Sequence, residues 1–290
     1  MDVVLPLSEN PITFSMTPSF LFRYVAILAG LLYSAALAAQ TPSAAKTFTY
    51  LIYHKLSPGL TIQDALPVER EWKTINQAAV DEGNLIGWYM MAKQMSSNPN
   101  SAEYDYVTVI VTPGMAMKGA SPAAMTKMYG DSVKTRMADL QKRDRATAPV
   151  VKMEIWETVD ALFSPDFAPD KTPTVVLDYV KLRDPSADWV SLVGPLKQQA
   201  AGRLKGGTIS GWDLSRLVVP NGSEKGYGLA IVQTVANLSA IASPDPAGPS
   251  AETTKLRAQS VRTFDVVRQD VFRLTEYTTR PKSTAAAGAK

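Results

Sequence analysis

Few residues in this chain are of types that do chemistry. The sequence has no cysteine and a single histidine, His54, so thiolate nucleophiles and thiolate metal sites are excluded, and a Ser-His-Asp triad would have to use that histidine. No glycine-rich phosphate loop, dinucleotide-binding fingerprint or HExxH pair is present. We therefore predict no metal site, and several large enzyme classes are excluded.

The remaining candidates lie on segments where polar and apolar residues alternate, as in β-strands. His54 shares one face of its segment with Tyr50 and Ile52, and Asp178 takes the position of Ile52 in a similar segment further on. One hypothesis is that these side chains line a cavity between two sheets, with His54 as a base or a haem ligand. The catalytic candidates are then Tyr53, His54 and Asp178, with Trp88 beside them.

A second interpretation is structural, and we favour it. Lys152 precedes Glu154 by two positions, as Arg268 precedes Asp270, and such repeated pairs are typical of ion pairs that hold two copies together. Both tryptophans of the repeated glycine motif begin a strand, where an indole could close a barrel end, and packing is favoured over ligand stacking. The ligand-binding candidates are Trp88, Glu154, Trp212 and Asp270.

These candidates sit within an internal repeat. The segment Gly83–Trp88 recurs as Gly207–Trp212, with both glycines and the tryptophan at the same spacing. Upstream, residues 49–59 align with 176–186, and downstream 151–158 align with 267–274. With two helical stretches in each copy, including 123–142 and 252–259, each copy is predicted to run strand, helix, strand, strand, helix, strand.

That order defines the ferredoxin-like βαββαβ unit, whose sheet has one bare face to bury. The predicted fold class is α+β, with two tandem ferredoxin-like repeats packed sheet to sheet as an intramolecular dimeric α+β barrel. We expect the first repeat at residues 39–163, a Pro-rich linker at 164–173, the second repeat at 174–279 and a loose tail at 280–290.

Residues 46 to 278 resemble the dimeric α+β barrel superfamily, in particular uncharacterised exported members. The phrases that carry the resemblance are "KLSPG", "EREWKTINQAAVDEGNLIGW" and the closing strand. The superfamily includes cofactor-free monooxygenases, haem-degrading and haem-peroxidase enzymes and small isomerases, so the resemblance implies a fold more firmly than a reaction.

The first 38 residues are predicted to be a signal peptide. Arg23 is followed by the apolar run Tyr24–Ala36 and by Ala36-Leu37-Ala38, a small-x-small cleavage site. The run is shorter than the roughly 20 residues that span a membrane. We expect export to the periplasm or the outside, without stable membrane insertion after cleavage, and the true start is either Met1 or Met16.

The sequence thus predicts an exported protein of unknown activity, a non-enzymatic small-ligand-binding or accessory barrel. The alternative is a cofactor-free monooxygenase-like or haem-linked oxidoreductase. We expect a small apolar ligand, no cofactor with haem as the alternative, and a monomeric pseudo-dimer or a higher oligomer. With 30 basic and 27 acidic residues and no basic run longer than two, we expect no nucleic-acid partner.

Overall fold

The computed structural model describes residues 46–279 except positions 99, 166, 223–224, 243–247 and 249, so the predicted signal peptide and tail lie outside the described residues. The described strands close into an antiparallel barrel in the order β1-β3-β2-β8-β5-β7-β6-β4. Their bounds are β1 Phe48–His54, β2 Gly87–Ser96, β3 Tyr106–Thr112, β4 Val150–Phe163, β5 Thr174–Leu182, β6 Gly211–Val219, β7 Leu229–Val235 and β8 Phe264–Tyr277.

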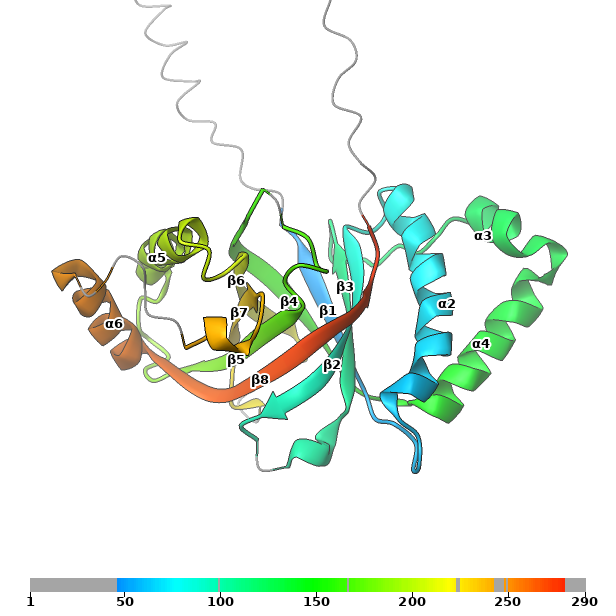
Figure 1. Ribbon diagram of the computed structural model, residues 1–290, viewed down its shortest axis with the longest axis horizontal. Helices are drawn as coiled ribbons and strands as arrows, with labels where there is room; N and C mark the ends of the chain where they lie inside the picture. Colours follow the sequence, from blue (N-terminus) through cyan, green and yellow to red (C-terminus); the bar gives the residue numbers. More distant parts are fainter. Residues whose placement is uncertain are drawn as a thin grey trace, which may run out of the picture. The chain divides into compact units, whose positions relative to one another are not determined.

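The barrel consists of two halves with the same internal order. The first half is β4-β1-β3-β2 and the second is β8-β5-β7-β6, and the pairs β2–β8 and β4–β6 join them. This arrangement confirms the predicted fold of two ferredoxin-like repeats packed as an intramolecular dimeric α+β barrel. In Figure 1 the helices of the first half lie on one side of the barrel and those of the second half on the other: α2 Ile62–Asp81, α3 Pro122–Tyr129 and α4 Val133–Thr147, then α5 Val193–Lys205 and α6 Ala251–Thr263.

The helices follow the sequence pattern, with one correction. Helix α2 begins at a capping box between Thr61 and Asp64 and buries Val68, Ile75 and Ala79 on one face. The single stretch predicted over 123–142 is instead α3 and α4, because Gly130 at φ 56° ends α3 and a short 3-10 turn separates the two. Helix α6 also extends beyond the predicted 252–259.

Alternation along the strands divides the core into an inner and an outer layer. The inner layer fills the barrel and includes Tyr53, Tyr179 and Phe272. The outer layer packs under the helices, and there Trp88 lies against α2 while Trp212 lies near α5. The expectation that these two tryptophans close the barrel ends is wrong, because each follows a glycine on the inner face and therefore points outwards.

The first glycine of each repeated motif ends a helix. Gly83 and Gly207 have φ values of 72° and 71°, in the left-handed region that side chains disfavour. Each backbone N–H bonds back to the preceding helix, at Val80 and Leu204 respectively. The motif therefore terminates α2 and α5 in the same way.

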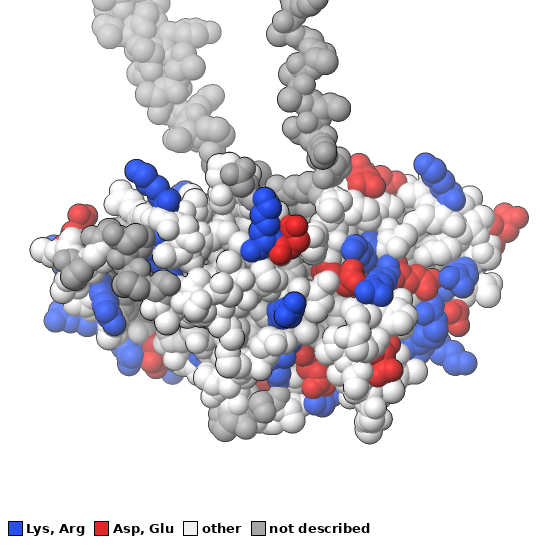
Figure 2. Space-filling model, in the orientation of Figure 1, with Lys and Arg blue, Asp and Glu red and all other residues white. Residues whose placement is uncertain are grey.

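The visible surface in Figure 2 has basic and acidic side chains interspersed over both groups of helices. Among the residues that the structure describes, none of the helices has the length and hydropathy needed to cross a membrane.

Candidate ligand-binding cavity

A cavity of about 350 Å³ lies inside the barrel, between the two sheets. Strands of both repeats contribute to its wall, and most of the lining is aliphatic or aromatic, including Tyr89, Met91, Trp156 and Phe163. Among the described residues that line it, Asp213 is the one with a charged side chain. An apolar cavity with very few polar groups is the usual form of a small-molecule site.

The second glycine of each motif makes room for an aromatic ring at this cavity. A Cβ atom on Gly87 would lie 2.6 Å from the Tyr89 hydroxyl oxygen. A Cβ on Gly211 would lie 2.6 Å from Cδ1 of Phe163 and from Oγ1 of Thr234. Real Cβ atoms do not approach so closely, so both positions are glycine because the rings of Tyr89 and Phe163 lie across the inner face there.

Asp213 occupies the inner face of β6, where alternation from Gly211 also places Ser215. The Ser215 hydroxyl donates to Asp213 Oδ1 at 2.6 Å, and the Thr158 side chain is a second hydrogen-bond partner. Burial raises the pKa of the Asp213 carboxyl to about 6, and the nearby negative charge of Asp160 adds to the effect. No ion pair with Asp213 is formed by the described residues.

The other end of the barrel interior holds a polar network around Glu154, which is fully buried. Its carboxylate accepts from Tyr53 at 2.7 Å, from Tyr227 at 2.5 Å and from Lys225. Burial alone would raise the pKa of Glu154, but Lys152 and these donors hold it below the usual value. The carboxylate is therefore ionised and fully engaged.

The second repeat contributes the matching half of the network. Tyr104 donates to Asp270 at 2.5 Å, and Arg268 binds the same carboxylate at 2.8 Å. Tyr104 belongs to the first repeat and Asp270 to the second, whereas Tyr227 and Glu154 have the opposite origins. A tyrosine of each repeat therefore donates a hydrogen bond to a carboxylate of the other repeat. These two bonds hold the repeats together.

The predicted pairs are present, with Lys152 Nζ 3.5 Å from Glu154 and Arg268 Nε 2.8 Å from Asp270. The two members of each pair are therefore in contact along one strand, and ligand binding by Glu154 and Asp270 stays a prediction. Trp156 links the two ends of the interior, since its ring lines the cavity and its Nε1 donates to Glu154 at 3.3 Å.

His54 lies outside the barrel, under the helices of the first repeat. Its Nδ1 is 3.1 Å from the Ala148 carbonyl and its Nε2 is 2.9 Å from Thr108 Oγ1. A carbonyl only accepts, so Nδ1 carries the proton and Nε2 accepts from the threonine. The ring stacks on Tyr106 at 4.5 Å, and burial lowers the His54 pKa to about 4. Both nitrogens are occupied.

His54 is also part of a buried group with Glu69 and Asp144. One possible ligand atom of each of the three lies within 4.8 Å of the others. Glu69 accepts a 2.7 Å hydrogen bond from Tyr106, and burial raises its pKa to about 8. At neutral pH this group therefore holds a neutral imidazole and a protonated carboxyl.

The sequence candidates separate into two sets. The barrel interior brings together Tyr53, Glu154 and Asp270, while Asp178 faces outwards and bonds to Gln269 at 2.7 Å. His54, Trp88 and Trp212 lie in the outer layer as well. The cavity residues Tyr89 and Asp213 are not among the candidates predicted from the sequence.

A signal for Asp213 was present in the repeat. After the shared Gly-Trp pair the first copy continues with Tyr89 and Met91 on the inner face, and the second with Asp213 and Ser215. The difference between the copies marks Asp213, but only the closed barrel shows that this face is the inner one.

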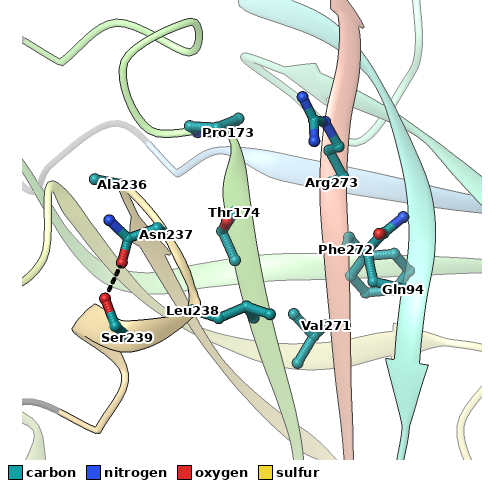
Figure 3. A pocket seen from close by; sticks show the side chains of 10 residues that line it. All are labelled: Gln94, Pro173, Thr174, Ala236, Asn237, Leu238, Ser239, Val271, Phe272 and Arg273. Atoms are coloured by element: carbon teal, nitrogen blue, oxygen red, sulfur yellow. Dashed lines mark hydrogen bonds between the residues drawn. The ribbon is translucent and has the colours of Figure 1, made fainter.

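A second depression lies on the outside of β5 and β8 (Figure 3). Its volume is about 440 Å³, and its lining includes Thr174, Asn237, Leu238 and Arg273. Leu238 is 49% exposed, and the hydrogen bond drawn there joins Ser239 to Asn237 within the same turn. This groove lies on the outside of the barrel and offers less apolar surface than the cavity between the sheets, so that cavity is the better candidate.

The fold is shared with solved proteins. No family model and no curated protein matches the sequence. Similar structures include an anthrone oxidase-like protein (12% identity, TM-score 0.48, 84% of this chain and 98% of that one). Others are a candidate monooxygenase from Fusobacterium nucleatum subsp. nucleatum (7%, 0.49, 82% and 96%) and a haem-binding protein from Thermus thermophilus (8%, 0.43, 79% and 91%). At these identities the likeness concerns the fold alone.

These comparisons contradict the prediction that the chain uses no cofactor. One neighbour is named as a haem-binding protein, and others are chlorite dismutases and a candidate dyp-type peroxidase.

Proposed function

We propose that this chain binds a small, largely apolar organic molecule between its two sheets and catalyses its oxidation, with dioxygen as the acceptor of the two electrons and two protons that the molecule loses. The observation that supports binding is the cavity of about 350 Å³, whose wall is formed by both repeats and contains one charged side chain, Asp213. This volume lies at the lower end of the roughly 300–1,000 Å³ of ligand pockets. The occupant is therefore small, with an aromatic or aliphatic body that contacts side chains such as Trp156.

Oxidation is the finer part of the proposal. It takes its support from the anthrone oxidase-like and monooxygenase neighbours, which share the fold. The residues of this chain contribute the shape of the cavity, the exclusion of water by its apolar wall and one acid–base group, the carboxyl of Asp213.

Haem is the cofactor that neighbour names suggest, and the described residues fit it poorly. The side chain expected as its ligand, His54, lies outside the cavity and uses both ring nitrogens for hydrogen bonds. The cavity is also near the lower size limit for a small ligand. No step of the proposed reaction passes through haem.

The test combines binding with turnover. Purified protein is titrated with hydroxylated polycyclic aromatics while tryptophan fluorescence, to which Trp156 in the cavity wall contributes, and oxygen consumption are followed. We expect saturable fluorescence quenching and substrate-dependent oxygen uptake, both weakened in Val109→Phe, which fills the cavity from β3. The control Val261→Phe changes a 59% exposed residue of α6 and leaves both signals intact. Quenching without oxygen uptake contradicts the oxidation, and the absence of both contradicts the site.

Export is proposed together with this function, on the composition of residues 1–38. Mass spectrometry of the protein isolated from its host is expected to find Ala39 at the N-terminus. Recovery of an uncleaved chain from the cytoplasm contradicts export and leaves the cavity proposal untouched.

A further inference from the structure

The cavity contains one charged side chain, and none of the residues that the structure describes forms an ion pair with it. The carboxyl of Asp213 lines a wall that is otherwise apolar or uncharged, and no Lys or Arg of the described residues forms an ion pair with it. By contrast, the two carboxylates at the opposite end of the barrel interior each pair with a cation, Glu154 with Lys225 and Asp270 with Arg268. The interior of this barrel thus matches its carboxylates to cations, except at the cavity.

None of the described cations pairs with Asp213 itself. On the β4 side, the charge of Asp160 acts on Asp213, and Lys197 of α5 binds Asp160 at 2.7 Å. On the β7 side the paired residue is Val232, and the cavity wall of the first repeat presents Tyr89. Ser215 and Thr158 donate hydrogen bonds to the carboxylate but carry no charge. The site is therefore a hydrogen-bonded anion at the edge of an apolar space.

A charged group in such a space is costly unless an opposite charge or a proton accompanies it. The rest of the wall suits the apolar body of a ligand, and Trp156, Phe163 and Phe167 present aromatic rings, which attract cations as well as apolar groups. A molecule with an apolar aromatic body and one ammonium group satisfies both parts of the wall at once.

We infer that the cavity selects a protonated amine on a small aromatic body, with the ammonium group bound to the carboxylate of Asp213. This inference rests on the proposed binding function and narrows its substrate class. The ammonium donates a charge-assisted hydrogen bond to the carboxylate, and the body occupies the apolar part of the cavity. A neutral molecule of the same shape leaves the carboxylate without a counter-charge, and an anionic one is repelled.

Three probes of one shape test the inference by calorimetric titration: 1-naphthylmethylamine, 1-naphthylmethanol and 1-naphthoate. At pH 8 we expect the amine to bind at least about tenfold more tightly than the alcohol, equivalent to about 1.4 kcal/mol, and the carboxylate probe to bind most weakly. In Asp213→Asn we expect the amine and the alcohol to bind with affinities within about twofold of each other. Asp178→Asn is the matched control, since it removes a carboxylate from the outer face, and it keeps the preference.

The same calorimetric titration is repeated at pH 5. The amine stays protonated between pH 5 and pH 8, whereas the Asp213 carboxyl, with a pKa of about 6, is protonated in about nine molecules of ten at pH 5. The affinity of the wild-type protein for the amine is therefore expected to fall about tenfold from pH 8 to pH 5. The alcohol is expected to show no such loss.

The outcomes separate this inference from the function on which it rests. Equal binding of amine and alcohol by the wild-type protein, lost in Val109→Phe, overturns the amine preference and keeps the cavity as an apolar site. An amine preference that persists in Asp213→Asn also overturns the inference, because another group then holds the ammonium. Failure of all three probes to bind removes the proposed function itself.

Discussion

The hydroxyl groups of Tyr53 and Tyr179 lie 2.9 Å apart inside the barrel, although the residues are 126 positions apart in the chain. They occupy equivalent positions on β1 and β5, and both are fully buried. Tyr53 donates its proton to Glu154 at 2.7 Å, so Tyr179 is the donor between the two hydroxyls. The two repeats therefore meet in an asymmetric hydrogen bond at symmetric positions.

This direction of donation predicts unequal effects of removing the hydroxyls. Tyr53→Phe leaves both Glu154 and the Tyr179 hydroxyl without this partner, and we expect it to cost about 2–3 kcal/mol of unfolding free energy. Tyr179→Phe removes one donor from a hydroxyl that keeps its bond to Glu154, and we expect about 1 kcal/mol. Urea unfolding of both variants gives the comparison, and an equal or reversed order contradicts the assigned direction.

Gly207 and Gly211, the two glycines of the second copy of the motif, are expected to tolerate substitution to different degrees. Gly207 needs only a left-handed backbone and has open space around its α-carbon, so Gly207→Asn is expected to cost less than about 1 kcal/mol. Gly211→Ala forces a Cβ against Phe163 and Thr234, and we expect about 1–3 kcal/mol together with weaker ligand binding. Thermal unfolding and probe titration of the two variants measure this. If Gly211→Ala changes neither the unfolding temperature nor the probe affinity, the Phe163 ring moves aside freely, which contradicts this prediction.

The raised pKa of the Glu69 carboxyl predicts that the folded protein becomes less stable as the pH rises. Burial raises its pKa to about 8 in the folded protein, against about 4.3 when unfolded, so the folded state binds more protons between these values. Its contribution to stability is therefore complete at low pH and is lost as the pH rises towards about 8. Glu69→Gln is expected to flatten this decline in denaturation curves between pH 5 and pH 9.

The control for Glu69 is Glu252→Gln, at an exposed position in the first turn of α6. We expect the control to keep the slope of the wild-type protein. If Glu69→Gln also keeps the wild-type slope of stability against pH, the buried carboxyl of Glu69 is ionised at neutral pH, which contradicts the prediction.

His54 is predicted to stabilise the fold without taking part in binding. His54→Phe keeps the stacking on Tyr106 but leaves the Ala148 carbonyl and the Thr108 hydroxyl without this partner. We expect a cost of about 1–3 kcal/mol and unchanged affinity for the naphthyl probes. A tenfold change in probe affinity in a folded variant contradicts the placement of His54 outside the site.

His54 also predicts sensitivity to acid. Burial lowers its pKa to about 4 from an ordinary value of 6.5, so the unfolded state binds more protons between these values. Stability from this group is present above pH 6.5 and is lost as the pH falls towards about 4. The slope of unfolding free energy against pH in this range is expected to be smaller in His54→Phe than in the wild-type protein.

The sequence by itself determined the architecture. The repeat of Gly83–Trp88 as Gly207–Trp212 and the order of strand and helix patterns require two similar units, and each unit has a sheet face that only another such face can bury. It also determined the ion pairs at Glu154 and Asp270, because a charged pair spaced by two residues stays on one face of a strand. These are local patterns, so they can be recognised without knowing the neighbours.

Only the tertiary structure decided which face is the inner one. The sequence alternation that groups His54 with Tyr50 is equally compatible with either side of the sheet, and closure of the barrel placed both under the helices. Closure of the barrel also points the Asp213 side chain into the cavity, where burial raises the pKa of its carboxyl. Register and sidedness depend on pairing between strands that are far apart in the chain, such as β2 with β8, and for that reason the site, unlike the fold, was not predictable from local spacing.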